Sequence, residues 1–207
     1  MQVWGISNTG TITAKGTVTD SAVSKAAVTS MSSSQLVTAV ENSSGNLQLS
    51  SWAVDSNGNI THQQDAFKGT VTQVDVASWG NSAGHVATAV RNGSQNLEVL
   101  DWLVDATTGA ITLQASKGGG AASKVAVCQI GTLIFTAAKD SSGKLDVGTW
   151  GYGGSTGTQF LESFSVELDK ASQVAAAPLT SGTYAASASI NGSGNVEVNA
   201  WLYGVIR

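Results

Sequence analysis

A tryptophan motif that recurs about every fifty residues constrains the fold of this chain more than any other feature. Its clearest copy is Gly45-Asn46-Leu47-Gln48-Leu49-Ser50-Ser51-Trp52, which is followed by a turn and then by Ile60-Thr61. Tryptophans in the same context lie at positions 52, 102, 150 and 201, at intervals of 50, 48 and 51 residues. A fixed period of this length with strand-like sequence is typical of repeat architectures. We therefore interpret the 207 residues as a single domain of four repeats.

Each repeat contains four short segments of β-type sequence separated by turn residues. In the first repeat these segments are residues 24–31, 36–40, 45–54 and 60–63. The turns between the second and third segments begin at Asn42, Asn92, Asp140 and Asn191. Asn and Asp side chains bond to nearby backbone and glycine tolerates positive φ, so these turns predict β-hairpins. The apolar positions change phase between Leu49 and Trp52, which indicates a strand buried on both faces or one that carries a bulge.

Four antiparallel strands in each repeat match one blade of a β-propeller. The predicted fold is therefore all-β, a four-bladed propeller of four-stranded antiparallel blades over residues 21–66, 70–115, 121–163 and 170–207. We expect residues 10–16 to supply the outer strand of the last blade, with residues 11–16 beside 196–205, so that the two terminal strands close the ring. The strand that contains Trp4 is then surplus. The alternative is an incomplete ring that a second chain completes.

The same repeat predicts where the aromatic side chains lie. We expect the four repeated tryptophans to pack in the core between neighbouring blades. Trp79 aligns with Met31, Ile130 and Leu179, and is expected to be a core residue as well.

Composition and charge exclude several classes of partner. Charged residues make up 12% of the chain and the formal net charge is -4, so there is no basic surface for nucleic acid or for anionic lipid. No apolar run is long enough for a membrane helix, and Cys128 is the only cysteine, so an intrachain disulfide is impossible. The first residues show no signal sequence. Low charge and abundant Ser and Thr favour a secreted or cell-surface protein over a cytoplasmic one.

The repeat resembles bacterial propeller-type proteins with tandem Gly-Asn-Leu-x-Leu-x-x-Trp-x-Val-x-x-x-Gly-x-Ile-Thr units. The resemblance covers the whole chain and is best in the first two repeats. In the fourth repeat Gly204 replaces the Asp of the turn and the Ile-Thr step is absent. The resemblance implies a propeller fold and no particular activity.

Five polar residues on the predicted inner strands are the candidates for a ligand site. Asp75 stands where the other repeats have alanine, and a carboxylate there must be solvated or paired, because a lone buried charge is costly. Two residues earlier in each inner strand lie Lys25, Gln73, Lys124 and Gln173. At one mouth of a central channel these side chains would form an anion cradle. The alternatives are that Asp75 pairs with a lysine or with nearby polar groups, and that the other four are solvated strand starts.

No constellation for catalysis or metal binding is visible in the sequence. His62 and His85 have no His, Cys or acidic residue at a metal-ligand spacing, and Cys128 aligns with small residues that we expect to be buried. The segment Asp55-x-Asn57-x-Asn59 lacks the Gly and Glu of a calcium loop. We expect no cofactor and a non-catalytic binding or scaffolding module, either lectin-like or protein-binding, that is a monomer or a homodimer. The alternative function is a structural, self-associating domain of a larger surface protein.

Overall fold

The computed structural model describes residues 1–19, 21–79, 84–153, 159–179 and 184–202, and side chains throughout these ranges except at 153, 159–165, 167 and 169. Fourteen β-strands and no helix occur in these ranges. The strands are β1 Gln2–Ile6, β2 Ile12–Thr17, β3 Val23–Ser30, β4 Gln35–Asn42, β5 Asn46–Val54, β6 Ile60–Ser78, β7 His85–Asn92, β8 Asn96–Val104, β9 Ile111–Ile130, β10 Leu133–Asp140, β11 Lys144–Gly153, β12 Gln159–Pro178, β13 Tyr184–Asn191 and β14 Val196–Leu202. The described part of the chain is thus all-β, as predicted, and contains no helix that could cross a membrane.

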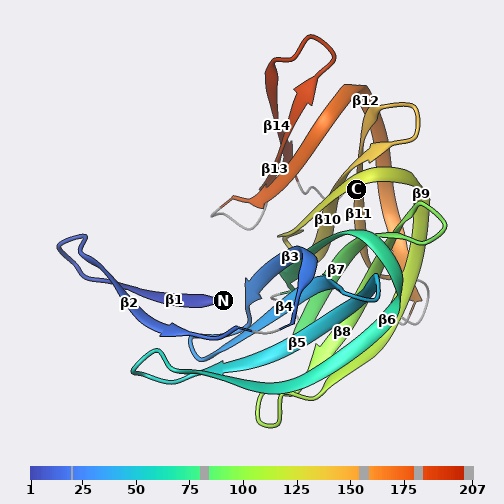
Figure 1. The fold of residues 1–207 in the computed structure, drawn as a ribbon. Coiled ribbons are helices and arrows are strands. Elements are labelled where there is room, and N and C mark those ends of the chain that lie inside the picture. The colour runs from blue at the N-terminus through green and yellow to red at the C-terminus, as the bar shows by residue number, and fades with distance from the viewer. Residues whose placement is uncertain (20, 80–83, 154–158, 180–183, 203–207) are drawn as a thin grey trace.

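Strands β3 to β14 form one antiparallel sheet in sequence order, and β1 and β2 form a separate hairpin (Figure 1). The long strands β6, β9 and β12 each change partner midway. Residues 60–70 of β6 pair with β5, whereas residues 71–78 pair with β7. The fourth segment of one repeat and the first segment of the next are therefore one continuous strand, although the sequence predicts two separate ones.

These partner changes divide the sheet into units. Unit 1 consists of β3, β4, β5 and residues 60–70, and unit 2 of residues 71–78, β7, β8 and residues 111–121. Unit 3 consists of residues 122–130, β10, β11 and residues 159–170. Unit 4 consists of residues 171–178, β13 and β14. In Figure 1 the hairpin β1–β2 extends away from unit 1 at one end of the array, and β13–β14 form the other end.

The predicted closure of the ring is wrong for the described residues. Strand β2 pairs only with β1, and β14 pairs only with β13; residues 203–205 lie outside the described ranges. The reason is that β2 has a local partner in the Trp4 strand. Closing a short hairpin loop costs much less entropy than pairing with a strand at the far end of the chain.

The register shows the role of the strand that contains Trp4, which had no place in the predicted four-bladed arrangement. Trp4 lies opposite Ala14, just as Trp52 lies opposite His62 and Trp102 opposite Leu113. The hairpin β1–β2 therefore has the geometry of the third and fourth strands of a unit.

A β-bulge precedes the tryptophan in each of these pairs. The register shifts between Ser51 and Trp52 because Gln63, on the outer strand, has no partner on β5. The same shift occurs before Trp4, Trp102 and Trp150. In β5 the run from Leu47 to Trp52 is also buried on both faces. The first sequence interpretation therefore holds for β5, whereas the second is wrong, because the extra residue lies on the partner strand β6 and not on the tryptophan strand.

The core lies between units, where two kinds of face meet. We call the side that carries the tryptophan the tryptophan face, and the opposite side, which carries Leu47 and Leu49 in unit 1, the leucine face. The leucine face of unit 1 packs against Trp102 of unit 2, and that of unit 2 packs against Trp150 of unit 3. Trp102 and Trp150 are buried between units and Trp79 is buried as well, so the core prediction is confirmed for these three. Trp52 is buried but, among the described residues, does not pack against another unit, and Trp201 is only partly buried against unit 3.

The predicted hairpin turns are also confirmed. Asn42 Oδ1 accepts hydrogen bonds from the backbone N–H groups of Ser44 and Asn46, and Asn92 and Asn191 make the equivalent contacts. The fourth position of these turns has positive φ, and in unit 2 it is occupied by Gln95 rather than by glycine.

Candidate functional site

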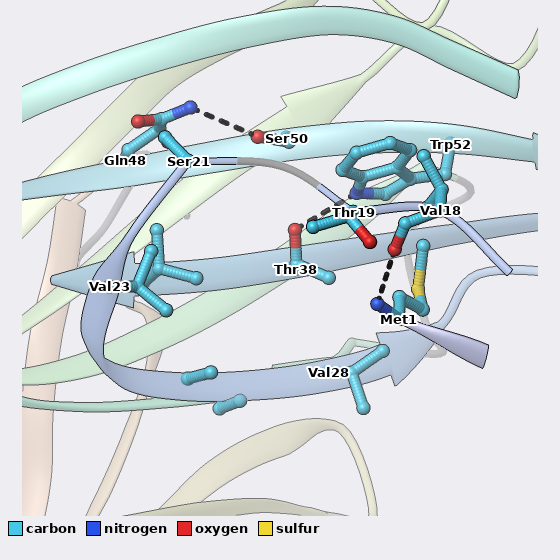
Figure 2. A pocket seen from close by; sticks show the side chains of 13 residues that line it. Met1, Val18, Thr19, Ser21, Val23, Val28, Thr38, Gln48, Ser50 and Trp52 are labelled. Carbon is cyan, nitrogen blue, oxygen red and sulfur yellow. Dashed lines mark hydrogen bonds between the residues drawn. The ribbon is translucent and has the colours of Figure 1, made fainter. Parts of the chain in front are cut away.

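A cavity of about 420 Å³ lies over the tryptophan face of unit 1. In units 2 and 3 this face is covered by the leucine face of the preceding unit. In unit 1 it is covered instead by Met1 and by residues 18–19, 21 and 23, which leave the cavity beneath them (Figure 2). The terminal amine of Met1 donates a 2.6 Å hydrogen bond to the carbonyl oxygen of Val18 and fixes this cover at its base.

The lining of the cavity combines an apolar surface with a row of polar groups. Trp52, Val28 and Val40 supply apolar surface, while Thr38, Gln48 and Ser50 project from the adjacent strands β4 and β5. Trp52 Nε1 donates a 2.9 Å hydrogen bond to Thr38 Oγ1, and Gln48 Nε2 donates a 3.4 Å bond to Ser50 Oγ. Thr38 accepts its bond, so its own proton can be donated to a ligand.

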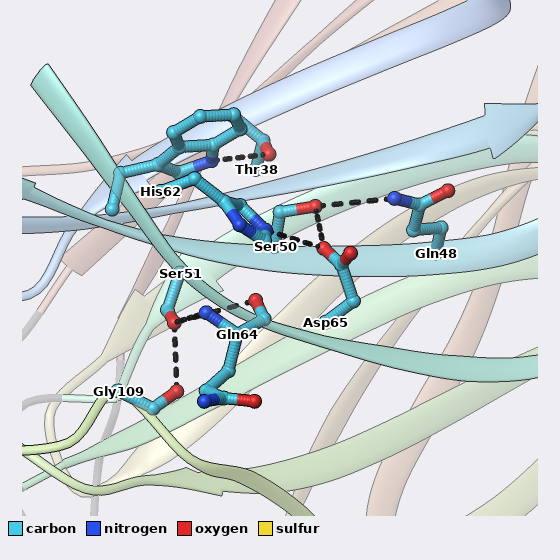
Figure 3. A network of polar contacts seen from close by, with 9 residues as sticks. Thr38, Gln48, Ser50, Ser51, His62, Gln64, Asp65 and Gly109 are labelled. Carbon is cyan, nitrogen blue, oxygen red and sulfur yellow. Dashed lines mark hydrogen bonds and ion pairs between the residues drawn. The ribbon is translucent and has the colours of Figure 1, made fainter. Parts of the chain in front are cut away.

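Ser50 connects the cavity to a carboxylate on the outer strand. Ser50 Oγ donates a 2.6 Å hydrogen bond to Asp65 Oδ1, which also lies 2.9 Å from His62 Nε2 (Figure 3). Burial raises the pKa of Asp65, but the bonds from Ser50 and His62 outweigh burial and hold the pKa below its usual value. Asp65 is therefore an ionised acceptor at neutral pH that orders the hydroxyl of Ser50.

A bulge brings His62 and Asp65 together. Residues three apart on a regular strand point to opposite faces, because side chains alternate with a period of two. The extra residue Gln63 shifts the phase, so both side chains lie on the tryptophan face. His62 packs edge-on against Trp52, with ring centroids 5.0 Å apart.

The polar chain of unit 1 has no counterpart in unit 2. The residues at the positions of Ser50 and His62 there are Leu100 and Leu113, and Leu100 is buried under the preceding unit. The Ser50–Asp65 chain is therefore absent from unit 2, whereas unit 4 has polar residues at the positions of Gln48 and Ser50: Asn199 donates a 3.1 Å hydrogen bond to Glu197.

The arrangement favours binding over nucleophilic catalysis. A serine nucleophile needs a base that accepts its proton, usually a histidine that a carboxylate orients. Here Ser50 and His62 both bond to the same carboxylate, and Ser50 does not bond to His62. The Ser50 hydroxyl is held as a donor to Asp65, which suits the recognition of polar groups.

Several solved structures are similar to this chain in fold. A protein from Lactobacillus plantarum matches with a TM-score of 0.63 and 14% identity over 95% of this chain and 60% of its own length. This similarity indicates that the chain has a β-propeller-like fold. The periplasmic gluconolactonase PpgL of Pseudomonas aeruginosa matches with a TM-score of 0.53 and 11% identity, over 97% of this chain and 78% of its own. The lectin SapL1, solved with α-methyl fucoside, matches with a TM-score of 0.50 and 12% identity, over 86% and 64%.

These matches concern the fold alone. The chain spans about three-fifths of the length of the Lactobacillus protein. No protein-family model and no curated protein sequence matches the chain.

The five residues predicted as a channel-mouth site lie elsewhere on the propeller-like array, on the inner strands of the units. Asp75 Oδ1 accepts a 2.9 Å hydrogen bond from Val76 N, and Oδ2 accepts a 2.8 Å bond from Val127 N on the inner strand of unit 3. Burial raises the pKa of Asp75, although both backbone bonds oppose it. Asp75 therefore joins two units through backbone contacts, and it forms no ion pair with a lysine among the described residues.

The structure does not join the other four candidates to one another. Lys25 Nζ donates to the carbonyl oxygen of Ser24 at 3.4 Å, and Gln73 Nε2 donates to that of Thr72 at 2.8 Å. Lys124 and Gln173 lie at the corresponding positions of β9 and β12. Anion binding at these residues stays a prediction.

A second polar cluster, between units 2 and 3, is structural in character. Asp101 is fully buried, lies 2.8 Å from His85 Nδ1 and accepts a hydrogen bond from the hydroxyl of Tyr152. Trp79 stacks on Tyr152 with ring centroids 5.6 Å apart. Burial, and then Asp101, raise the pKa of Tyr152 far above its usual value, so the phenol stays protonated as a donor. Sequence reasoning missed both His–Asp pairs, since each joins separate strands or spans a bulge.

The described residues hold no group of three His, Cys, Asp or Glu side chains that could bind a metal ion. Cys128 is buried, as predicted, and burial raises the pKa of its thiol to about 12, with a further contribution from Asp75. The thiol is therefore a neutral core group at physiological pH.

Proposed function

We propose that the protein is a non-catalytic, lectin-like binding module that holds a small neutral carbohydrate in the cavity on the tryptophan face of unit 1. The observation that carries this proposal is the polar chain Gln48–Ser50–Asp65 beside the apolar surface of Trp52 and Val28. The cavity has the size of a small-molecule site, for which about 300–1,000 Å³ is typical.

A sugar suits both parts of this lining. Its ring presents apolar C–H groups on one face and hydroxyls at its edge. The C–H groups fit Val28, Val40 and the side of Trp52, while the hydroxyls can exchange bonds with Thr38 and Gln48. Asp65 supports this role by fixing Ser50, and it places negative charge close to the cavity. That charge disfavours an acidic sugar.

Solved structures of similar fold support a carbohydrate ligand. The structures of similar fold include a lectin solved with a fucoside and a gluconolactonase, so both sugar binding and catalysis occur on such folds. Binding is favoured here because Ser50 and His62 share one acceptor and do not form a nucleophile–base pair.

A glycan array followed by calorimetric titration of the best binder tests the proposal. Ala26→Phe places a large side chain in the cavity from an exposed position on β3, and we expect it to weaken binding at least about tenfold. Gln48→Leu removes the amide and should weaken binding by a similar factor. Ala175→Phe, at an exposed position on the inner strand of unit 4, is the control and should bind like the unmodified protein.

Two outcomes would contradict the proposal. One is an array without any bound glycan. The other is a glycan that binds Ala26→Phe as tightly as it binds the unmodified protein.

A further inference from the structure

The last unit exposes a face that is buried in every preceding unit. Val196 and Val198 on β14 are 73% and 67% exposed. Their equivalents lie five and three residues before the tryptophan of units 1 to 3, and are at most 4% exposed: Leu47, Leu49, Leu97, Val99, Leu145 and Val147. Each of those pairs belongs to a core cluster shared with the following unit. The leucine face of unit 4 is therefore apolar in the same way, but nothing covers it among the described residues.

The hairpin β1–β2 exposes the complementary face. Trp4 and Ile6 on β1 are 54% and 72% exposed, and Ile12 on β2 is exposed beside them. By register Trp4 corresponds to Trp102, and Ile6 to Val104; both of these are buried against unit 1. The hairpin thus has a tryptophan face without a leucine face against it in the described part of the chain.

We propose that a second copy of this chain supplies the missing contact, head to tail. The leucine face of unit 4 in one copy, formed by Val196, Val198 and Leu202, packs on the tryptophan face of the β1–β2 hairpin in the next copy. This contact continues the packing between successive units, in which a Val or Leu pair meets a tryptophan face. Exposed apolar patches of this kind mark interaction surfaces, and removal of their area from water drives association.

The strands that carry these faces also have open edges. On the described residues β14 pairs only with β13, and β1 only with β2, so each has one edge with open backbone groups. Open edges are templates for pairing with another chain. Face packing holds two strands about 10 Å apart, whereas edge pairing needs about 4.8 Å, so the proposed contact uses the faces and leaves these edges open.

A head-to-tail contact uses two different surfaces, so it is heterologous and gives closed rings or open chains of subunits. It is distinct from the proposed carbohydrate site, because none of Trp4, Ile6, Val196 and Val198 lines that cavity. This inference does not rest on the proposed function.

Sedimentation velocity across the micromolar range tests the contact, with two variants that each block one face. Val198→Asp damages the leucine face and Trp4→Ser damages the tryptophan face. Each variant alone should stay monomeric, at a concentration where the unmodified protein associates. An equimolar mixture should form a heterodimer and nothing larger, since each partner keeps one intact face. Leu103→Asp, at a half-exposed position of unit 2 equivalent to Leu202, should associate like the unmodified protein.

Circular dichroism confirms that the variants are folded before they are compared. An unmodified protein that is monomeric across the range overturns the proposal. So does a mixture of folded variants that forms no complex, or a Trp4→Ser variant that associates by itself, because the latter result would mean that the leucine faces pair with each other.

Discussion

Thr88 Oγ1 accepts a hydrogen bond of 3.1 Å from the indole nitrogen of Trp102 inside the core between units 1 and 2. The same bond joins Trp52 to Thr38, Trp150 to Thr136 and Trp201 to Ser187, always across fourteen residues. Tryptophan buries more apolar surface than most side chains, but its N–H needs an acceptor when it leaves water. The hydroxyl on the second strand of each unit supplies that acceptor, so this pair allows the repeated tryptophan to be a core residue.

Replacement of Trp102 by alanine should lower the free energy of unfolding by about 3–5 kcal/mol, the usual cost of a large aromatic cavity. Urea unfolding measures the change. Trp4→Ala is the matched control: Trp4 has the same register in its hairpin but is largely exposed, so its loss should cost less than about 1 kcal/mol at concentrations where the protein is monomeric. Equal losses for the two variants would contradict the assignment of Trp102 to the core.

Thr88→Val should lower the free energy of unfolding by about 1–3 kcal/mol, because it keeps the shape of the side chain and leaves the Trp102 N–H buried without an acceptor. Thr88→Ser keeps the hydroxyl and should lose less, since Ser187 performs this role in unit 4. A valine variant that is as stable as the serine variant would show that the hydrogen bond contributes nothing.

Gln95→Gly should raise the free energy of unfolding by about 0.5–1 kcal/mol. Gln95 has a φ of 66°, where the equivalent turns have Gly45, Gly143 and Gly194. The left-handed conformation costs a residue with a Cβ about 1–2 kcal/mol, and the larger entropy of glycine in the unfolded chain offsets part of the gain. Thermal and urea unfolding measure the change. A loss of stability would mean that the bond from Arg91 to the Gln95 side chain outweighs the strain.

Asp75 and Asp105 should affect stability in opposite directions as pH changes. Burial raises the pKa of Asp75 above 3.8, so its contribution to stability is greatest below pH 3.8 and is lost as pH rises through the folded-state pKa. Asp75→Asn should therefore gain in stability relative to the unmodified protein as pH rises through that window. Bonds from Thr108 and Thr107 lower the pKa of Asp105, so its contribution is present above pH 3.8 and is lost as pH falls through the lowered pKa.

Urea unfolding at a series of pH values measures both variants. Asp105→Asn is the control, and its deficit relative to the unmodified protein should shrink in acid. If the difference between Asp75→Asn and the unmodified protein is the same at every pH above 3.8, the raised pKa of Asp75 is wrong.

Local features of the sequence were sufficient to predict strands, turns and core tryptophans. The alternation of apolar residues and the turns that begin with Asn or Asp are local features that extend over only a few residues. Asn42 therefore begins a hairpin turn and Trp52 is buried, as the repeat predicts. Ring closure was wrong because it depends on competition between partners: β2 pairs with the nearby β1 and not with β14. No local sequence pattern predicts which of two distant strands a given strand pairs with.

The candidate site could not be predicted, for two physical reasons. Its cavity exists because Met1 and residues 18–19, 21 and 23 cover unit 1 in place of a complete unit, which is a property of the tertiary arrangement. Its carboxylate meets Ser50 and His62 only because Gln63 bulges, and a strict period of two would place His62 and Asp65 on opposite faces. The sequence singled out Asp75 as a departure from the repeat but could not show its partners, which are the backbone N–H groups of Val76 and Val127.

The most direct test of the central claim is nuclear magnetic resonance of the tryptophan indole N–H groups during titration with the best glycan ligand. Trp52 lines the cavity, whereas Trp102 and Trp150 are enclosed between units, and a Trp52→Phe variant assigns the Trp52 signal. We predict that the Trp52 indole signal shifts in proportion to binding while those of Trp102 and Trp150 stay in place. Saturation of the protein with ligand without any shift at Trp52, together with a shift at another tryptophan, would place the binding site elsewhere and contradict the proposal.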